Sequence, residues 1–208
     1  MKRWLLPAAL LLLAGCETLA PRVDGPADLQ AWEARRDWLQ ELDRWRLEGR
    51  VAIAMQDDGW NANLDWTQAG EHLEVNFSGP LGVGSARVAG TPAQLEVHTA
   101  DGEHFVTTDP EIDLYWQLGW TAPLDRMRYW VLGLPGPAGD SPALQIDAAG
   151  RLVQLTQGAW TVEYIDYLVT DSGRVLPRKI EMRREGVRIR LVVSDWVLPS
   201  KARKAAGN

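Results

Sequence analysis

The chain has 208 residues, a formal net charge of −6 and a single cysteine. The negative charge, and the lack of a basic stripe with interleaved aromatic residues, argue against a nucleic-acid partner. One cysteine excludes an intramolecular disulfide, a thiolate zinc site, an iron–sulfur cluster and a CxxC redox motif. Aromatic usage favours tryptophan, with 11 Trp against 4 Tyr and 2 Phe. Trp suits places where apolar surface meets a polar or wet environment.

Residues 1–15 are predicted to be an export signal. Lys2 and Arg3 precede an apolar run over residues 5–13, which is too short for a stable membrane span. Cys16 directly follows an Ala-Gly pair, and this arrangement resembles the lipobox of bacterial lipoproteins. The resemblance implies cleavage before Cys16 and acylation of its thiol, so that lipid holds the mature protein on a membrane. The alternative is a secreted protein with a free thiol.

The residues after the cysteine indicate to which membrane the lipoprotein is sorted. Glu17 stands where the inner-membrane retention signal of enteric bacteria has Asp, which favours the outer membrane. Residues 16–27 contain two prolines and a glycine, a composition typical of a flexible tether. This segment is therefore expected to connect the lipid anchor to the folded body.

An amphipathic helix is predicted to follow the tether. Asp28 is a suitable N-cap, because its carboxylate can accept from a free backbone N–H of the first turn. Apolar residues then recur at roughly helical spacing. The predicted apolar face comprises Leu29, Trp32, Leu39, Leu42 and Trp45.

From Leu47 onward apolar residues alternate with polar ones, which is the period of antiparallel strands. Two short helices are predicted between the strands, over residues 109–118 and 124–131, the second ending before Gly133. About eleven strands around two central helices indicate an antiparallel α+β fold. The runs with the clearest alternation are 51–55, 60–66, 73–77, 144–147, 151–157, 160–169, 175–184 and 187–196.

The strand predicted over residues 160–169 is apolar on both faces. Trp160, Val162 and Tyr164 share one face, whereas Ile165 and Tyr167 lie on the other. One layer of helix cannot cover both faces of so large a sheet, so the sheet is expected to curl around its own interior, with the short helices closing one mouth. Periodicity alone leaves two alternatives, an apolar cavity for a ligand or a fully packed core.

No catalytic motif is present. His72, His98 and His104 show neither HxH nor HExxH spacing and are expected to be ordinary strand or surface histidines, with no metal site and no cofactor. Gly84-Ser85-Ala86 lacks the second glycine of a nucleophile elbow, and Gly82-Val83-Gly84 is not followed by the GK[ST] of a phosphate loop. The sequence therefore predicts that the protein is not an enzyme.

The turn Gly79-Pro80-Leu81-Gly82 has an unusual composition. Pro80 and the flanking glycines favour a tight reversal, which places the apolar Leu81 at a loop tip where a polar residue is expected. An exposed apolar side chain at such a tip suits contact with a membrane or an acyl chain. The alternative is that Leu81 folds back onto the rim of the sheet.

Taken together, the motifs along the chain resemble those of the LolB family of outer-membrane lipoprotein receptors. The similarity covers nearly all of the chain after the signal, and its most specific part is the Trp-Val-Leu-Gly-Leu-Pro element at residues 130–135. It implies an unclosed β-barrel of eleven antiparallel strands with a helical lid over a hydrophobic cavity. The motifs are the lipobox at Cys16 and the segments 47–51, 60–66, 79–82, 124–135 and 157–160, with the terminal Trp196.

The resemblance implies a carrier function. A LolB-like protein accepts the acyl chains of lipoproteins from a periplasmic LolA-type carrier and releases them into the inner leaflet of the outer membrane, and it is expected to act as a monomer. The lipid-binding domain would span residues 28–198, followed by a basic tail over 199–208. Leu81 with Pro80 would form the membrane-insertion loop. The residues implied in the acyl-chain cavity or its lid are Trp66, Phe77, Trp116, Trp130 and Trp160.

A competing interpretation is a structural outer-membrane lipoprotein that scaffolds an envelope complex without transferring lipid. Trp130 and Trp160 do not decide between the receptor and the scaffold, because whether each faces a cavity or packs beneath a lid is left open by the sequence.

Overall fold

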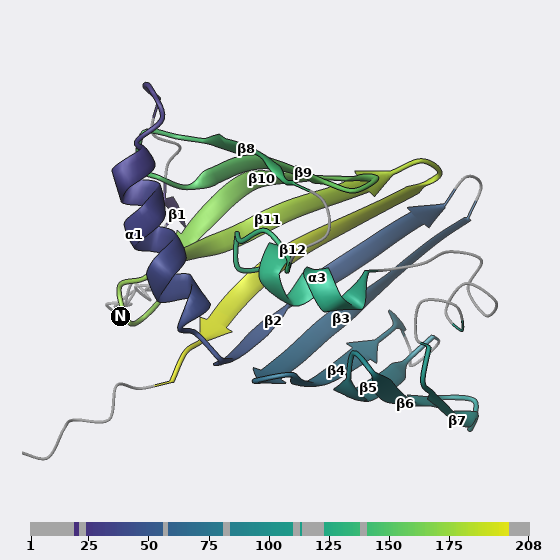
Figure 1. Ribbon diagram of the computed structural model, residues 1–208. Coiled ribbons are helices and arrows are strands. Elements are labelled where there is room, and N and C mark those ends of the chain that lie inside the picture. The colour runs from purple at the N-terminus through teal and green to yellow at the C-terminus, as the bar shows by residue number, and fades with distance from the viewer. Residues whose placement is uncertain are drawn as a thin grey trace, which may run out of the picture.

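The computed structural model describes residues 19–20, 24–55, 58–80, 84–109, 113, 123–137 and 141–199. Their strands form one antiparallel sheet in the order β7-β6-β5-β4-β3-β2-β12-β11-β10-β9-β8, and β1 pairs with β10 beside this path (Figure 1). The strands are β1 Leu19–Ala20, β2 Arg44–Met55, β3 Asp58–Ala69, β4 His72–Ser78, β5 Ala86–Thr91, β6 Gln94–Thr99, β7 His104–Thr107, β8 Ala143–Ile146, β9 Leu152–Gln157, β10 Trp160–Val169, β11 Val175–Arg184 and β12 Val187–Val197. The eleven strands of the main path confirm the predicted antiparallel α+β architecture.

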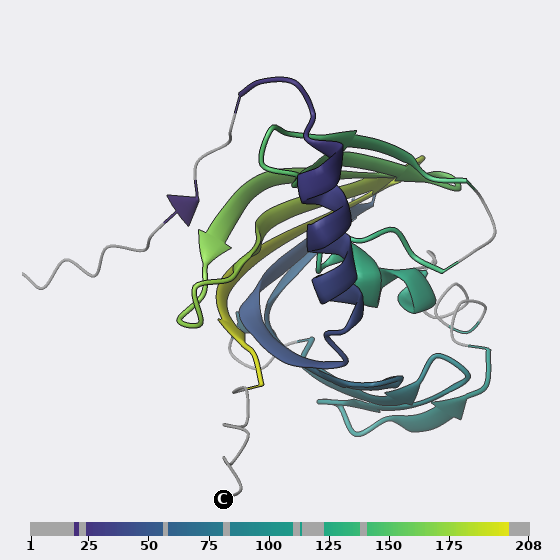
Figure 2. The ribbon, with the colours of Figure 1, turned by 60° about the vertical axis from the view of Figure 1, so that its left-hand side comes forward.

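The sheet consists of two runs of sequential hairpins, β2–β7 and β8–β12, which join where β12 pairs with β2. At this seam Gly49 is required for close approach, since a Cβ there would lie 2.4 Å from the carbonyl oxygen of Val192. The sheet curls strongly, and its two end strands, β7 and β8, lie on opposite sides of an opening (Figure 2). The sheet is therefore unclosed, as predicted.

The core lies on the concave face of this sheet. Along β2, buried Trp45, Leu47 and Val51 alternate with more exposed residues, and the partner strands β3 and β12 continue the pattern in register. Three indole rings meet here, with centroids of Trp45 and Trp66 5.1 Å apart and those of Trp45 and Trp196 5.4 Å apart. Burial of these large rings contributes heavily to the stability of the fold, because the stabilising free energy is proportional to the apolar area removed from water.

Helix α1, Leu29–Gln40, is shorter than the predicted apolar face. Its N-cap is the predicted one, because the backbone N–H of Ala31 donates to the Asp28 carboxylate at 2.9 Å. The assignment of Trp45 to the helix was wrong, since that residue lies in β2 and is buried by the sheet. Leu29 is 67% exposed and Leu42 follows the helix end, so Trp32 and Leu39 are the members of the predicted set that are both helical and buried.

Helix α1 packs on the turn between β8 and β9. At Gly150, with φ +66°, a Cβ would come within 2.4 Å of the backbone N of Trp32, so the helix and turn backbones touch. In the same turn Asp147 accepts from the guanidinium of Arg151 at 2.7 Å, and both side chains are buried. Burial raises the pKa of Asp147, but hydrogen bonds from Arg151 and from the Ala149 backbone outweigh it, so the net pKa is lowered.

Asp147→Asn is expected to destabilise the fold at pH 7 by about 3 kcal/mol, because it removes the negative charge that faces the buried Arg151 guanidinium at 2.7 Å. The Asp147 pKa is depressed on folding, so its contribution is fully present above the ordinary value of 3.8 and disappears as the pH falls through the lowered value. The gap between wild type and variant should therefore shrink in acid. Urea titrations at several pH values measure it, and a gap that is constant with pH would contradict the assignment.

Helix α3, Leu124–Trp130, lies inside the curl of the sheet (Figures 1 and 2). It begins after Pro123 and is followed by Gly133 at φ +83°, as the sequence predicts. The predicted helix over residues 109–118 falls almost entirely outside the described residues.

The C-terminal end of α3 is bound to the β8–β12 run. The indole Nε1 of Trp130 donates to Gln157 at 3.0 Å, and the hydroxyl of Tyr164 donates to the Trp130 carbonyl at 2.9 Å. Gln157 is 1% exposed and also accepts from the backbone N–H of Gly136 at 2.9 Å. Burial raises the pKa of Tyr164, which keeps its phenol neutral as a hydrogen-bond donor.

The opposite run of strands contacts α3 through Arg128. Its guanidinium donates to the Gly70 carbonyl at 3.1 Å, in the turn between β3 and β4, and lies 3.8 Å from the exposed carboxylate of Glu71. Helix α3 therefore bridges the two runs of strands, with buried bonds on one side and a largely solvent-accessible contact on the other.

Candidate functional site

Half-buried apolar side chains form a continuous patch on the concave face, on strands β2–β5. The cross-strand pair Ile53 and Trp60 starts the patch, and the rings of Trp60 and Phe77 meet edge-on with centroids 5.4 Å apart. Val88, which is the register partner of Val75 on β4, extends the patch onto β5. The concave patch, defined here as Ile53, Met55, Trp60, Phe77 and Val88, packs on the buried core without being fully covered.

Helix α3 contributes further half-buried apolar side chains. Leu124 and Met127 pack against the same core as the concave patch and are likewise only partly buried. Met is unbranched and adapts to irregular surfaces. Within the described residues, the helix and the patch together offer flexible apolar surface with few polar groups, which suits an alkyl chain.

At the rim of the concave patch, the backbone at Gly84 lies close to the Trp60 ring. A Cβ at Gly84 would lie 2.7 Å from the indole Nε1 of Trp60, and Gly84 has φ +69°. The absence of a side chain there lets the Trp60 ring lie against the chain that leads into β5. Gly84, the one residue of the Gly82-Val83-Gly84 segment within the described residues, thus lies against an aromatic ring.

The predicted cavity tryptophans lie deeper than the concave patch. Trp66, Trp130 and Trp160 are 6%, 0% and 4% exposed, and the rings of Trp130 and Trp160 have centroids 6.0 Å apart. Trp66 donates its Nε1 hydrogen to Gln68 at 3.0 Å. Trp130 is the last residue of α3 and packs beside Trp160 of β10, while Phe77 lies in the half-buried patch. Trp116 is outside the described residues.

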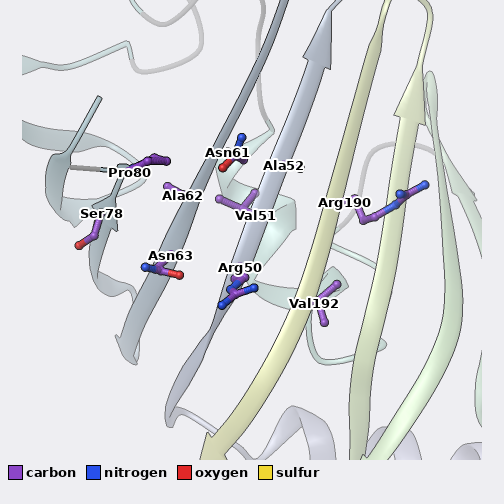
Figure 3. A pocket seen from close by; sticks show the side chains of 10 residues that line it. All are labelled: Arg50, Val51, Ala52, Asn61, Ala62, Asn63, Ser78, Pro80, Arg190 and Val192. Atoms are coloured by element: carbon purple, nitrogen blue, oxygen red, sulfur yellow. The ribbon is translucent and has the colours of Figure 1, made fainter. Parts of the chain in front are cut away.

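The predicted insertion loop is described only in part, because Leu81 and Cys16 lie outside the described residues. Pro80 is exposed and lines a pocket of about 370 Å³ on the outer face of the sheet (Figure 3). The side chains on this face include Arg50, Asn63 and Val192, which are neighbours in the β12–β2–β3 register. This pocket, lined by both polar and apolar side chains, lies on the opposite side of the sheet from the concave patch.

Ile53, Met55, Trp60 and Val88 were absent from the predicted site. The alternation of the sequence placed them on the inner face of their strands, but it does not distinguish a covered position from one that stays partly open. None of the helices in the described ranges has the length and apolarity needed to cross a bilayer.

Comparison with known proteins decides the family. The model of the family described as "Outer membrane lipoprotein LolB" matches residues 43–196. The chain belongs to the LolB family. The outer-membrane lipoprotein LolB of Stutzerimonas stutzeri is 36% identical over 198 residues, covering 94% of this chain and 95% of that protein. The LolB of Nitrosococcus oceani is also 36% identical, covering 91% of this chain and 94% of that protein.

Solved structures support the fold assignment. A LolA superfamily protein from Nitrosomonas europaea superposes with a TM-score of 0.50 at 12% identity, covering 88% of this chain and 99% of that chain. An outer-membrane lipoprotein-sorting protein domain from Vibrio parahaemolyticus, described as putative in its title, gives 0.52 at 8% identity, covering 85% and 94%. The LolB family member described here therefore shares the curled sheet of the LolA superfamily.

Proposed function

We propose that this LolB family member is an outer-membrane receptor that accepts the acyl chains of lipoproteins from a LolA-type periplasmic carrier and inserts them into the outer membrane. The observation that carries the proposal is the concave patch, apolar and only partly covered, inside a sheet of the LolA superfamily fold. Membership of the LolB family supports the outer membrane as the place where the receptor acts. Lipid on Cys16 would hold the receptor at the membrane, and residues 16–27 would be its tether.

The physical basis of transfer is the insolubility of acyl chains in water. Each CH₂ group removed from water contributes about 0.8 kcal/mol, so a chain must pass from one apolar surface to another without being released free. The concave patch and the half-buried face of α3, with Leu124 and Met127, offer such a surface. The protein makes and breaks no covalent bond in this process.

The decisive experiment is transfer of a lipoprotein from a LolA-type carrier to the full chain, followed by delivery to vesicles. We expect a complex with the lipoprotein in the first step and its appearance in the vesicles in the second. A variant with Phe77→Asp should lose acceptance, because a charged group would enter the concave patch. A structural scaffold without lipid transfer would leave the lipoprotein on the carrier.

Delivery should depend on Leu81 separately from acceptance. Leu81→Glu places a charge at the predicted tip, which is costly to bring into lipid, so the variant should accept lipoprotein normally and deliver it at least about tenfold more slowly. The matched control is Leu29→Glu, which charges a leucine that is 67% exposed on α1. Normal delivery by Leu81→Glu, measured by vesicle flotation, would show that the loop is only a turn.

A further inference from the structure

Two of the three histidines of the chain converge on one carboxylate at the edge of the sheet. The Nε2 atoms of His98 and His104 each lie 2.9 Å from Oε1 of Glu96. The two imidazole rings stack with centroids 4.3 Å apart and an interplanar angle of 15°. Sequence spacing did not reveal this cluster, because its members meet only when β6 pairs with β7.

The register of the hairpin explains the convergence. His98 and His104 are directly opposite each other at the end of the β6–β7 ladder, and Glu96 is two residues before His98 on the same face. Period-two alternation therefore sends all three side chains to the outer face. All three residues are exposed, so an ion has direct access from solvent.

We propose that Glu96, His98 and His104 form a binding site for a divalent transition metal ion, with Zn²⁺ the best fit. Imidazole nitrogen and carboxylate oxygen are preferred zinc ligands, and three protein ligands with one open position is a common zinc arrangement. The three donor atoms lie within 4.8 Å of one another. Zinc bonds of 2.0–2.1 Å in a tetrahedron place ligand atoms about 3.4 Å apart, so small side-chain rotations suffice.

The hydrogen-bond geometry suits an incoming cation. Both imidazole Nε2 atoms point at the same oxygen of the Glu96 carboxylate, which is a hydrogen-bond acceptor. Each Nε2 therefore donates a hydrogen in the metal-free arrangement. A zinc ion would take the place of these two hydrogens: each ring would bind it through a deprotonated Nε2 and carry its single proton on Nδ1 instead.

Neighbouring charges do not oppose binding strongly. Arg87 on β5 lies beside His98 in the register, but its guanidinium pairs with Glu74 at 3.1 Å. Strand β7 is the last of the main sheet path and pairs only with β6 among the described strands. A bound ion would therefore fasten the edge strand to its neighbour and stabilise the folded state by mass action.

The test uses the untagged full chain with Cys16→Ala, in detergent and stripped of metal, so that neither a tag nor the thiol contributes ligands. Calorimetric titration with ZnCl₂ should show one ion per chain. His98→Ala, His104→Ala and Glu96→Gln should each weaken binding by roughly tenfold or more. His72→Ala, which removes the one histidine outside the cluster, is the matched control and should bind as wild type does.

A second readout comes from NMR of the three histidine rings. Zn²⁺ should shift the imidazole signals of His98 and His104 while leaving those of His72 in place, and should raise the melting temperature of wild type but not of His98→Ala. Absence of Zn²⁺ binding by wild type would overturn the proposal. So would stoichiometric binding that persists in the double variant His98→Ala/His104→Ala.

Discussion

Gly49→Ala is expected to cost about 3 kcal/mol of the free energy of unfolding. A Cβ at this position would lie 2.4 Å from the Val192 carbonyl oxygen and 3.0 Å from the Cα of Val193. Both obstacles are backbone atoms at the seam between β2 and β12, so they cannot be relieved by a side-chain rotation. Forced overpacking of this kind typically costs 1–3 kcal/mol, and the seam is where the β2–β7 and β8–β12 runs are joined.

The control for this prediction lies in the same hairpin. Gly59 at the start of β3 has only the Ile53 carbonyl near an added Cβ, at 3.7 Å, so Gly59→Ala should change stability by less than about 1 kcal/mol. Urea unfolding followed by tryptophan fluorescence compares the two variants. Equal effects at Gly49 and Gly59 would mean that the β2–β12 backbones are not in the close contact described.

Gln157→Leu is expected to destabilise the protein by about 4 kcal/mol and to loosen α3. The substitution keeps the side chain's approximate size but removes the acceptor for the Trp130 indole and for the Gly136 backbone N–H. Each buried donor left without a partner costs about 1–3 kcal/mol. Because α3 covers the core beside the concave patch, the variant should also exchange a bound fluorescent fatty acid faster than wild type.

Gln145→Leu is the matched control. Gln145 is exposed on β8 and makes its hydrogen bond to Gln154 in contact with water, so its loss should cost less than about 0.5 kcal/mol. Near-ultraviolet circular dichroism should change for Gln157→Leu, since Trp130 loses its hydrogen bond, and remain unchanged for Gln145→Leu. A Gln157 variant as stable as the Gln145 variant would contradict the role assigned to the buried amide.

Much of the sheet was predictable because alternation and turn chemistry act locally. The predicted limits 160–169 and 175–184 coincide with β10 and β11. Errors arose where two periods overlap: Trp45 fits the helical spacing of α1, yet it is buried as the second residue of β2. Asp58 and Gly59 are residue types typical of turns, but they belong to β3. The hydrogen-bonded ladder overrode local preference in both segments.

The candidate site was less predictable because it depends on contacts between distant segments. The family resemblance pointed to Trp130 and Trp160. Their burial depends on Gln157 and on strands that lie far along the chain from α3. The histidine cluster required the β6–β7 register, which brings His104 opposite His98. Short motifs do not contain this information, since it arises from chain pairing and not from spacing.

Helix α3 is attached more firmly to the β8–β12 run of strands than to the β2–β7 run. Its Trp130 end is fixed to the β8–β12 run by buried hydrogen bonds with Gln157 and Tyr164. On the other side, the hydrogen bond from Arg128 to the Gly70 carbonyl is exposed to water and so holds the helix less firmly than the buried bonds. The Gly70 contact is therefore expected to break before the buried bonds of the Trp130 end do.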